Sequence, residues 1–303
     1  MFGGHVVDGV SVLLSGTVWY DLINGNCANG VFMSDKSIKK VVYTCITDSY
    51  DDLFDHRFVH PDWDYICFSD TAKPNDSNRS WQIRPLRYAK HDPTRNNRWH
   101  KINPHLLLSK YHYSLYVDAN IEITSQKFFD NIDKSMKFAV SKHPEQNCAY
   151  KESKACAILK KDDVVVMNKL IEKMKTDGFP ANYGLHQNGI IFRQHMDTKV
   201  VEVMRLWWKL VRNYSKRDQI SLPYVLWTKK FKAQNLKIKS IQKCDELKIW
   251  PHNKDVRAHV NYLEIKSIAY QKQVKNMAKE LRQIKSTKSW KLVGFINSHL
   301  RHK

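Results

Sequence analysis

The sequence predicts a mixed α/β protein whose central sheet is mostly parallel and is flanked by helices. Short runs with strand character alternate with stretches of helical periodicity from residue 40 onward, and this alternation is typical of parallel strands joined by helices. A second observation is the run YHYSLYVDANIEI at 111–123, where a buried-strand pattern leads directly into Asp118 and Asn120. Ligands of open α/β sheets bind outside the carboxyl ends of the strands. The sequence therefore places two oxygen-bearing side chains where a ligand is expected.

The predicted elements follow one another with polar or Pro-containing connections between them. We predict strands at 41–47, 63–70, 81–86, 113–117, 121–123, 137–143 and 188–193. We predict helices from Asn103-Pro104 onward, over 151–178 in broken form, over 198–215, from about 217 with Pro223 at its start or at a kink, and over about 260–285. Asn at the cap and Pro at the first helical position favour the first of these helix starts.

The chain divides into three segments by composition. Residues 1–38 are rich in Gly and Asn and form a lead whose structure the sequence leaves open; 39–258 form the α/β domain, and 259–303 form a basic helical tail. The formal net charge is +20, and from residue 229 onward 19 Lys and Arg stand against 5 Asp and Glu. Most of the positive charge thus lies in the last quarter, and it predicts attraction to polyanions, anionic lipid or phosphorylated ligands.

The cysteines and the hydropathy pattern bear on the compartment. The six cysteines form no C-x-x-C pair, and we interpret them as reduced, buried, small apolar residues. No apolar run approaches the roughly 20 residues that span a bilayer. These features predict a cytoplasmic protein, peripheral at the inner face of a membrane where the basic tail meets anionic lipid. A solvated basic helix that packs on the domain is the alternative for the tail.

Asp118 and Asn120 are candidate metal ligands. An Asp-x-Asp/Asn pair at a strand end can hold a hard divalent cation through oxygen while the cation holds a diphosphate. Both residue types also favour turns, so a plain turn between two strands remains the alternative.

Three segments together resemble a known family. RWHKINPHLLLSKYHYSLYVDANIEI, then GLHQNGIIFRQH, then RDQISLPYVLW, in this order and spacing, resemble the TOD/MUCI-type glycosyltransferase-like family of GT-A character, over roughly residues 40–255. The resemblance implies a GT-A-like fold that binds a nucleotide sugar and transfers a hexose or related sugar. It also leaves lipid amide hydrolysis open, because members have been linked to that reaction.

The resemblance implies a metal site with one departure from the common pattern. Asp118 matches the acidic position of the strand-end motif, and Asn120 stands where many GT-A enzymes have a second Asp. Mn²⁺ or Mg²⁺ is the expected cofactor, held more weakly because one negative charge is missing. His252 is the candidate third ligand, with His259 as the alternative and a surface or packing role as the default for either.

The other two motifs supply candidate substrate contacts. His186, Gln187 and Asn188 precede a predicted strand and have hydrogen-bonding groups that suit sugar hydroxyls, although a plain connecting loop has the same composition. Asp218 is the candidate catalytic residue, which deprotonates or orients an acceptor hydroxyl, with Arg217 and Gln219 fixing donor groups. An acidic residue in the first turn of a helix is also what the helix dipole favours.

Residues after the first two strands are candidates for nucleotide contact. Thr44, Asp48 and Tyr50 belong to or follow the first strand, and Asp70 ends the second. A basic cluster precedes the Asp118 strand: Arg84, Arg87, Arg95, Arg98 and Lys101. We expect one or two of these, Arg98 and Lys101, to neutralise the donor diphosphate, and the rest to form a solvated face.

The predicted function is therefore metal-assisted transfer of a hexose from a nucleotide-diphosphate donor to a glycan or lipid-linked acceptor. The chain contains no G-x-G-x-x-G and no G-x-x-x-x-G-K-[ST], which argues against dinucleotide oxidoreductases and P-loop ATPases. Two alternatives remain: a basic protein that binds nucleic acid or another polyanion, and a metal-dependent lipid or amide hydrolase. No nucleic-acid-binding motif is present, so we do not expect nucleic acid as a partner.

Overall fold

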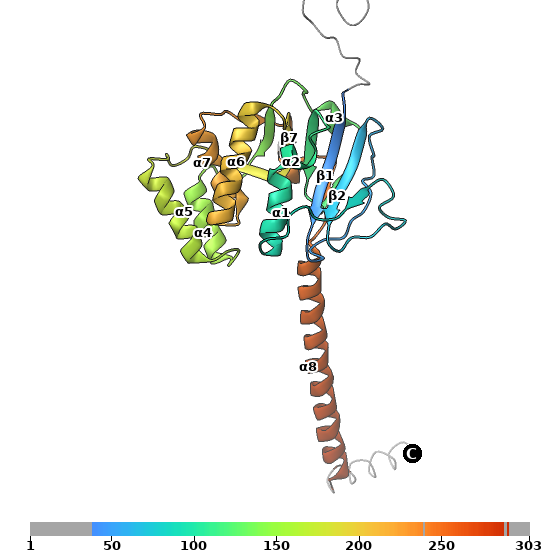
Figure 1. Cartoon of the computed structure of the whole chain (residues 1–303). Helices are drawn as coiled ribbons and strands as arrows, with labels where there is room; N and C mark the ends of the chain where they lie inside the picture. The colour runs from blue at the N-terminus through green and yellow to red at the C-terminus, as the bar shows by residue number, and fades with distance from the viewer. Residues whose placement is uncertain (1–37, 239, 288–289, 291–303) are drawn as a thin grey trace, which may run out of the picture.

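The computed structural model describes residues 38–238, 240–287 and 290, which form an α/β body and a long helix that extends from it (Figure 1). The strands are β1 Lys40–Ile46, β2 Trp63–Ser69, β3 Gln82–Arg84, β4 Tyr113–Val117, β5 Ile121–Ile123, β6 Phe138–Lys142, β7 His186–Arg193, β8 Gln234–Asn235 and β9 Leu247–Ile249. The helices are α1 Pro93–Ile102, α2 Pro104–Leu107, α3 Lys127–Asp130, α4 Ala149–Ile158, α5 Val164–Thr176, α6 Thr198–Asn213, α7 Asp218–Thr228, the 3₁₀ turn η2 Ile241–Lys243 and α8 Asn253–Ser286. The predicted lead at 1–38 lies almost wholly outside the described residues.

The main sheet has the strand order β3-β2-β1-β4-β7-β6-β8. Parallel pairings join β3 to β2, β2 to β1, β1 to β4 and β6 to β8, while β7 runs antiparallel to both β4 and β6. The predicted fold class, a mostly parallel sheet flanked by helices, is thereby confirmed. The antiparallel β7 has one consequence for function, since its amino end lies at the same edge as the carboxyl ends of β1, β2 and β4.

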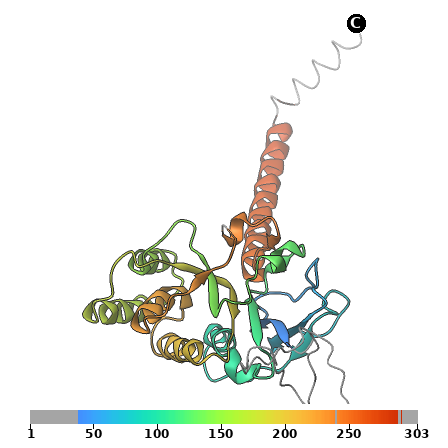
Figure 2. The same cartoon turned by 90° about the horizontal axis from the view of Figure 1, so that it is seen from above.

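The two faces of the sheet pack into two separate cores. Along β1, Val41, Tyr43 and Cys45 belong to one core and Val42 and Ile46 to the other, because successive strand side chains point to opposite faces. The first core is completed by residues of α1, α4, α5, α6 and α7, and the second by residues of α3, β5 and η2. Figure 2 shows α4, α5, α6 and α7 gathered on one side of the sheet, with α8 apart from them. Both faces are covered, which explains why β1 is buried along its whole length.

The helix α1 is the main element that the sequence interpretation missed. Its sequence PTRNNRWHKI has little apolar periodicity, and the side chains that it buries include Asn96, His100 and Lys101. Its start has a clear signal in retrospect, since Asp92 caps the helix by accepting a hydrogen bond from the Arg95 amide and Pro93 follows the cap. The helix expected at Pro104 is only the single turn α2.

The basic tail is helical as predicted, and its helix begins earlier than expected. α8 starts at Asn253 and runs to Ser286, away from the body (Figures 1 and 2). Within the described part of the chain, no helix is long and apolar enough to cross a membrane.

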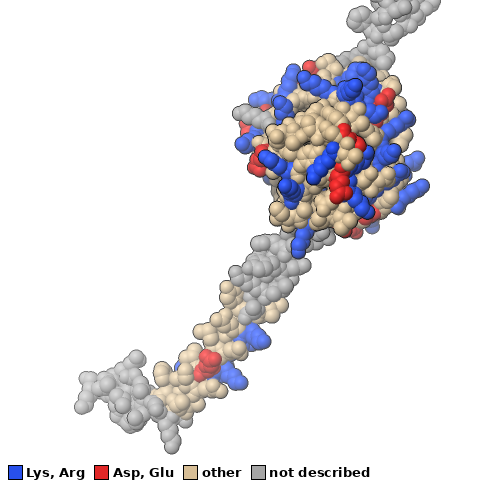
Figure 3. All heavy atoms as spheres, turned by 90° about the vertical axis from the view of Figure 1, so that its left-hand side faces the viewer, with Lys and Arg blue, Asp and Glu red and all other residues tan. Residues whose placement is uncertain are grey.

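The cysteines and the surface charge also bear on the predictions. The five described cysteines are free and buried, as predicted for small apolar residues. Figure 3 shows Lys and Arg side chains scattered over one face of the body with acidic side chains among them. On that face the basic residues do not form a continuous stripe of the kind that tracks a nucleic-acid backbone.

Candidate active site

The candidate site lies at the edge of the sheet where the carboxyl end of β4 meets the amino end of β7. The Asp118 amide donates a hydrogen bond to the Gly189 carbonyl across these strands, at 2.8 Å. A Cβ on Gly189 would approach within 3.1 Å of Asp118 Oδ2 and 3.0 Å of Ile121 Cδ1. A side chain at this position would require these side-chain atoms to move by a few tenths of an ångström, so the glycine lets β7 approach the Asp118 carboxylate closely.

A buried ion cluster forms the centre of the site. Asp218 is 4% exposed, and its carboxylate lies 3.1 Å from Lys101 Nζ and 3.2 Å from Arg98 Nε. Lys101 Nζ also lies 3.5 Å from Asp118 Oδ1, so that one buried ammonium joins the two carboxylates. Burial of charge is costly unless partners compensate it, and here every charge has an opposite charge within ion-pair distance.

The elements that carry these charges explain why they converge. Arg98 and Lys101 are three residues apart on α1, and therefore share one face of that helix. Asp218 is the first residue of α7, and its carbonyl accepts hydrogen bonds from Trp207 Nε1 on α6 and from the Ser221 hydroxyl. Packing of α1 on α6 and of α6 on α7 thus brings α1 cations to an α7 carboxylate.

The Asp118 carboxylate is held from within its own strand as well. The Tyr116 hydroxyl donates a hydrogen bond to Asp118 Oδ1 at 2.9 Å, because residues two apart on a strand lie on the same face. Lys101 Nζ lies 4.9 Å from the centre of the Tyr116 ring. About a third of the Asp118 side chain remains exposed, which makes it the solvent-facing carboxylate of the cluster.

The electrostatics of the cluster keep Asp218 ionised. Burial acts to raise the pKa of Asp218, but Lys101, Arg98 and Arg217 outweigh it and hold the pKa well below the usual range for an aspartate. Such a carboxylate is a permanent anion at neutral pH and a weak proton acceptor. Of the two roles that the sequence suggests for Asp218, orientation of an acceptor hydroxyl suits this environment better than removal of its proton.

The three polar residues at the start of β7 have different surroundings. Asn188 Nδ2 lies 3.4 Å from Asp218 Oδ2, so Asn188 joins the cluster directly. Gln187 instead links β7 to η2, since its side chain donates to Gln242 and accepts from the Ile241 amide. Burial, reinforced by Lys142, lowers the pKa of His186 to about 4, which leaves its ring neutral at pH 7. Asn188 Oδ1 and His186 Nδ1 have no hydrogen-bond partner among the described residues.

Arg217 and Gln219 flank Asp218 and support the same region. The Gln219 side chain donates a hydrogen bond to the His186 carbonyl at 2.8 Å, which joins the start of α7 to the start of β7. Arg217 stands at the cap position of α7, where its backbone amide is bonded to the Ser215 hydroxyl. Its charge contributes to the lowered pKa of Asp218.

Asn120 and His252 lie at the base of α8. Asn120 and Trp250 exchange two hydrogen bonds, from Asn120 Nδ2 to the Trp250 carbonyl and from the Trp250 amide to the Asn120 carbonyl. His252 Nδ1 lies 2.9 Å from an Asp51 carboxylate oxygen. A carboxylate on one ring nitrogen is the usual outer partner of a metal-binding imidazole.

The candidate metal ligands suit a divalent ion that takes most of its coordinating oxygens from phosphate and water. Among the described residues, no group of three or more His, Cys, Asp and Glu side chains is placed to hold a metal ion. Asp118 supplies one partly exposed carboxylate, and Asn120, two residues further along the chain, has an amide oxygen in addition to the Nδ2 that it donates to Trp250. Mg²⁺ and similar ions commonly bind through one or two carboxylates together with phosphate oxygens and water. The residues present therefore fit such an ion, with phosphate oxygens completing its shell.

The candidate nucleotide residues lie along the ends of β1 and β2. The Asp48 amide donates to the Asp70 carboxylate at 3.1 Å, and Asp48 and Ser49 both have left-handed backbone with φ of 57° and 49°. Tyr50 stacks at a tilt on His252, with ring centres 4.8 Å apart. Thr44 differs from the others, because it lies inside β1 and is fully buried.

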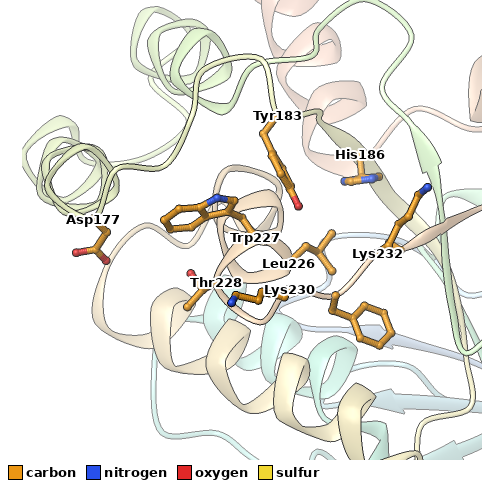
Figure 4. Close-up of a pocket in the computed structure, with 10 residues that line it drawn as sticks. Asp177, Tyr183, His186, Leu226, Trp227, Thr228, Lys230 and Lys232 are labelled. Carbon is orange, nitrogen blue, oxygen red and sulfur yellow. The ribbon is translucent and has the colours of Figure 1, made fainter.

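A cavity of about 860 Å³ opens beside His186, between the loop that precedes β7 and the end of α7. Figure 4 shows Tyr183 and Trp227 at one side of the cavity and His186 and Lys232 at the other. Lys230 also lines it. Aromatic faces combined with cationic and neutral polar groups make a surface that suits a hydroxylated ligand with negative charge.

The structure thus brings most of the predicted residues to one edge of the sheet. Arg98, Lys101, Asp118, Asn188 and Asp218 form one connected cluster. Arg95, from the same basic cluster in the sequence, instead binds backbone carbonyls at the end of α6. The sequence interpretation missed Tyr116 and Asp51. The position of Tyr116 two residues before Asp118 was an available signal, whereas the pairing of Asp51 with His252 depends on contacts between distant segments.

Comparisons with known proteins agree with this picture at the level of the family. The family model described as TOD1/MUCI70, glycosyltransferase-like domain, matches residues 31–254. Together with the α/β fold and the strand-end site, this match defines a protein of the glycosyltransferase-like class. The chain belongs to the TOD1/MUCI70 glycosyltransferase-like family, and the predicted family and the GT-A-like fold class are confirmed. No curated protein matches the chain.

Two solved structures are similar to the chain at low identity. One is described as an apo structure of the bifunctional glycosyltransferase WbbM, with 13% identity, coverage of 70% of this chain and 40% of that one, and a TM-score of 0.37. The other is the galactosyltransferase LgtC in complex with donor and acceptor sugar analogs, with 8% identity, coverage of 61% and 70%, and a TM-score of 0.38. The chain spans about two-fifths of the first protein, and at these TM-scores neither structure carries an argument about mechanism.

Proposed function

We propose that the chain transfers a hexose from a nucleotide-diphosphate donor to a glycan or lipid-linked acceptor, with Mn²⁺ or Mg²⁺ assisting. The observation that carries the proposal is the buried cluster of Arg98, Lys101, Asp118 and Asp218 at the ligand-binding edge of the sheet, in a chain that belongs to a glycosyltransferase-like family. Charged side chains that are buried and mutually compensated at such an edge are typical of functional sites.

On the donor side, α1 supplies the positive charge. Arg98 and Lys101 are held by Asp218, so binding of a diphosphate would not need to order long flexible side chains first. Arg217 adds a third cation to the same region. We infer that these groups orient the diphosphate, and that Tyr50, Asp48 and Asp70 contact the base or ribose beyond the ends of β1 and β2. Thr44 lies deeper in β1, and we assign it a supporting role under the nucleotide.

The metal site in this proposal is built on Asp118. Asn120 and His252 would complete it, and the contact between His252 and Asp51 would orient the imidazole. When bound, the ion supplies Lewis-acid compensation of the negative charge that grows on the departing nucleotide diphosphate. The role of this chain's own residues is to hold the Asp118 carboxylate rigidly through Tyr116 and Lys101.

On the acceptor side, we assign the cavity beside His186 to a part of the acceptor remote from the reacting hydroxyl, because the cavity is lined by the last turn of α7 whereas Asp218 begins that helix. Tyr183 and Trp227 offer ring faces, and the neutral His186 can donate or accept a hydrogen bond to a hydroxyl. Asn188 follows His186 by two residues on β7, and its Nδ2 lies 3.4 Å from the Asp218 carboxylate. Asp218 then orients the attacking hydroxyl by accepting its hydrogen bond, and its permanent charge stabilises a cationic sugar in the transition state. Cytoplasmic location and contact of the basic tail with anionic lipid remain predictions.

Calorimetric binding of a nucleotide-sugar panel, with and without Mn²⁺, tests the proposal. We expect one donor to bind with an affinity that increases with Mn²⁺, and Asp118→Ala to remove the metal dependence. Asp76→Ala is the matched control, because Asp76 is an exposed aspartate whose ion pair among the described residues is with Arg79. No binding by any donor under either condition would contradict the assignment. Release of a fatty acid or amine from a lipid amide, without sugar transfer, would favour the hydrolase alternative.

A further inference from the structure

The helix α8 exposes an apolar stripe with a regular spacing. Tyr270, Val274, Met277, Leu281 and Ile284 are each more than half exposed. They are separated by four, three, four and three residues, an average of 3.5 residues. This is the spacing of the a and d positions of a coiled coil, at which each helix presents a narrow seam to a partner helix.

The same spacing continues toward the start of the helix in the sequence. Positions 256, 260, 263 and 267 carry Val, Val, Leu and Ser, so nine successive a and d positions extend over four heptads. Val stands at two of the four a positions, which favours two-stranded parallel coiled coils, whereas Leu281 at a with Ile284 at d is a pair that larger bundles use. The helix is 34 residues long, which is much longer than the average helix of a globular domain.

The charged residues of α8 follow the same heptad. With Tyr270, Met277 and Ile284 at d, the cations Lys272, Lys275, Lys279 and Arg282 occupy f and b positions, away from the seam. Glu280 falls at a g position and Lys285 at the following e position. In a parallel, in-register pair of helices, the g residue of one helix faces the e residue of the next heptad on the other. Glu280 would therefore face Lys285 of a second copy, twice in the symmetric dimer.

Glu280 has no charged residue three or four positions away on its own helix. Residues three and four positions away from it on either side are Asn276, Met277, Gln283 and Ile284, and none is charged. The other e and g positions between 270 and 287 carry Gln, Ala or Thr, so this register creates no like-charge contact there. Charge complementarity thus selects a second copy of this chain, in parallel register, as the occupant of the stripe.

We propose that α8 pairs with α8 of a second copy in a parallel two-stranded coiled coil, which makes the protein a dimer. The inference is independent of the proposed function. It competes with the expectation that the tail lies on anionic lipid, and the seam favours the dimer, because a membrane-surface helix needs a broad apolar face rather than a narrow a/d stripe. Ile268 is an exposed aliphatic residue outside the stripe among the side chains of α8 that the structure describes.

The base of α8 links this dimer to the candidate site. Trp250 is bonded to Asn120 and its Nε1 donates to Glu122, while His252 contacts Asp51. The residues that connect α8 to the body are thus those that border Asp118 and the end of β1. A parallel coiled coil would hold two bodies at the same end of the helix pair, each with its site next to the helix base.

Sedimentation equilibrium of the full chain tests the proposal. At about 10 µM we expect a mass twice the 35.7 kDa of the chain, and Leu281→Lys should raise the dimer Kd roughly 100-fold or more, because it buries a charge in the seam. Gln283→Lys makes a comparable charge change outside the seam and should leave the dimer intact. A wild type that stays monomeric, or a dimer indifferent to Leu281→Lys, would overturn the proposal.

Charge reversal tests the register. Glu280→Lys and Lys285→Glu should each raise the dimer Kd about tenfold, because two attractive contacts become repulsive, and the double variant should restore the wild-type value. Additive weakening in the double variant would rule out the parallel register. Met277→Cys should form a disulfide between copies under mild oxidation, as d positions face each other, whereas Gln283→Cys should not.

Flotation with vesicles distinguishes the lipid alternative. Wild type and Leu281→Lys are compared on vesicles of neutral phosphatidylcholine and on vesicles with one-third phosphatidylserine. We expect Leu281→Lys to change self-association and not vesicle binding. A monomer whose binding to anionic vesicles requires Leu281 would overturn the dimer in favour of a membrane-surface helix. Unchanged tryptophan fluorescence of the variants confirms that the body remains folded.

Discussion

The Asp218 cluster and the α8 stripe are opposite arrangements of polar and apolar groups. The cluster joins buried side chains of α1 and α7 to the partly exposed Asp118 that follows β4, and gives each an opposite charge within the body. The stripe instead leaves five large apolar side chains exposed on one helix. Buried charge persists only where partners are present, and exposed apolar surface of this regularity is typical of an interface. The charged groups of the body find their partners within one chain, whereas the apolar stripe of α8 needs a second copy under the proposal above.

The largest expected effect comes from removal of the central carboxylate. Asp218→Ala leaves Arg98 and Lys101 buried without their main partner, and we expect a loss of about 3–5 kcal/mol in the free energy of unfolding. Urea denaturation followed by tryptophan fluorescence measures it, with Asp76→Ala as the exposed control. A loss below about 1 kcal/mol would mean that water reaches the cluster and solvates its charges, so that they do not depend on one another as buried charges do.

The stability of the body should depend on pH more than the pairing of α8 does, because the buried histidines lie in the body. Burial lowers the pKa of His100 and of His195 to about 4, below the ordinary value near 6.5. The unfolded chain therefore binds more protons than the folded one between about pH 4 and 6.5, and stability falls as the pH decreases through that window. We expect a loss of about 2 kcal/mol for one such histidine between pH 7 and 5.

Calorimetric melting between pH 7.5 and 5 measures this loss. His100 offers a structural check, since its Nε2 accepts a hydrogen bond from the Arg87 amide and its Nδ1 contacts the Asn96 carbonyl. That arrangement uses a neutral ring, and protonation of Nε2 would break it. A melting temperature that stays constant across the range would show that these rings are solvated.

A smaller effect is expected where β7 approaches β4. Gly189→Ala places a methyl group against Asp118 Oδ2 and Ile121 Cδ1, and we expect a loss of about 1–3 kcal/mol in stability. The displaced carboxylate should also weaken Mn²⁺-dependent donor binding at least tenfold. Gly184→Ala is not a matched control, because Gly184 has a φ of 121°; a conservative change at the exposed Val165 serves instead. Unaltered donor binding in a folded Gly189→Ala protein would separate Asp118 from the metal site.

The smallest effect is expected on the outer side of α8. Ile268 is 67% exposed and lies outside the stripe, so Ile268→Ala should change stability and dimer affinity by no more than about 0.5 kcal/mol. Denaturation and sedimentation on the same preparation measure both quantities. A dimer that dissociates in this variant would show that the contact surface is wider than the a/d seam.

Much of the fold was predictable from local pattern. The strands β1, β2, β4 and β7 and the helices α4 to α7 agree with the predicted ranges within a few residues, because their apolar periodicity is strong. α1 was not predictable in this way, since it buries His100 and Lys101 and has few apolar residues. Its burial depends on partners in β4 and α7, which local sequence does not reveal.

Some residues of the candidate site were likewise identifiable from local sequence, and others were not. Asp118 was identifiable because a carboxylate directly follows a buried strand, and Asp218 because it begins a helix. The electrostatic state of Asp218 was not identifiable, since it depends on cations from another helix. The same holds for Gln187, which the sequence suggested as a sugar contact and which the structure places in contact with Gln242 and Ile241.

The sequence by itself determined the alternation of strands and helices, the polar residues at the strand ends and the heptad spacing of α8, because each depends on neighbours within a few residues. The tertiary structure decided which of the basic residues reach Asp218, how Gly189 positions Asp118, and how the base of α8 joins the site. These contacts connect α1, β4, β7 and α7 across the fold. Their energies depend on burial and on distance in space, and neither quantity is contained in the local sequence.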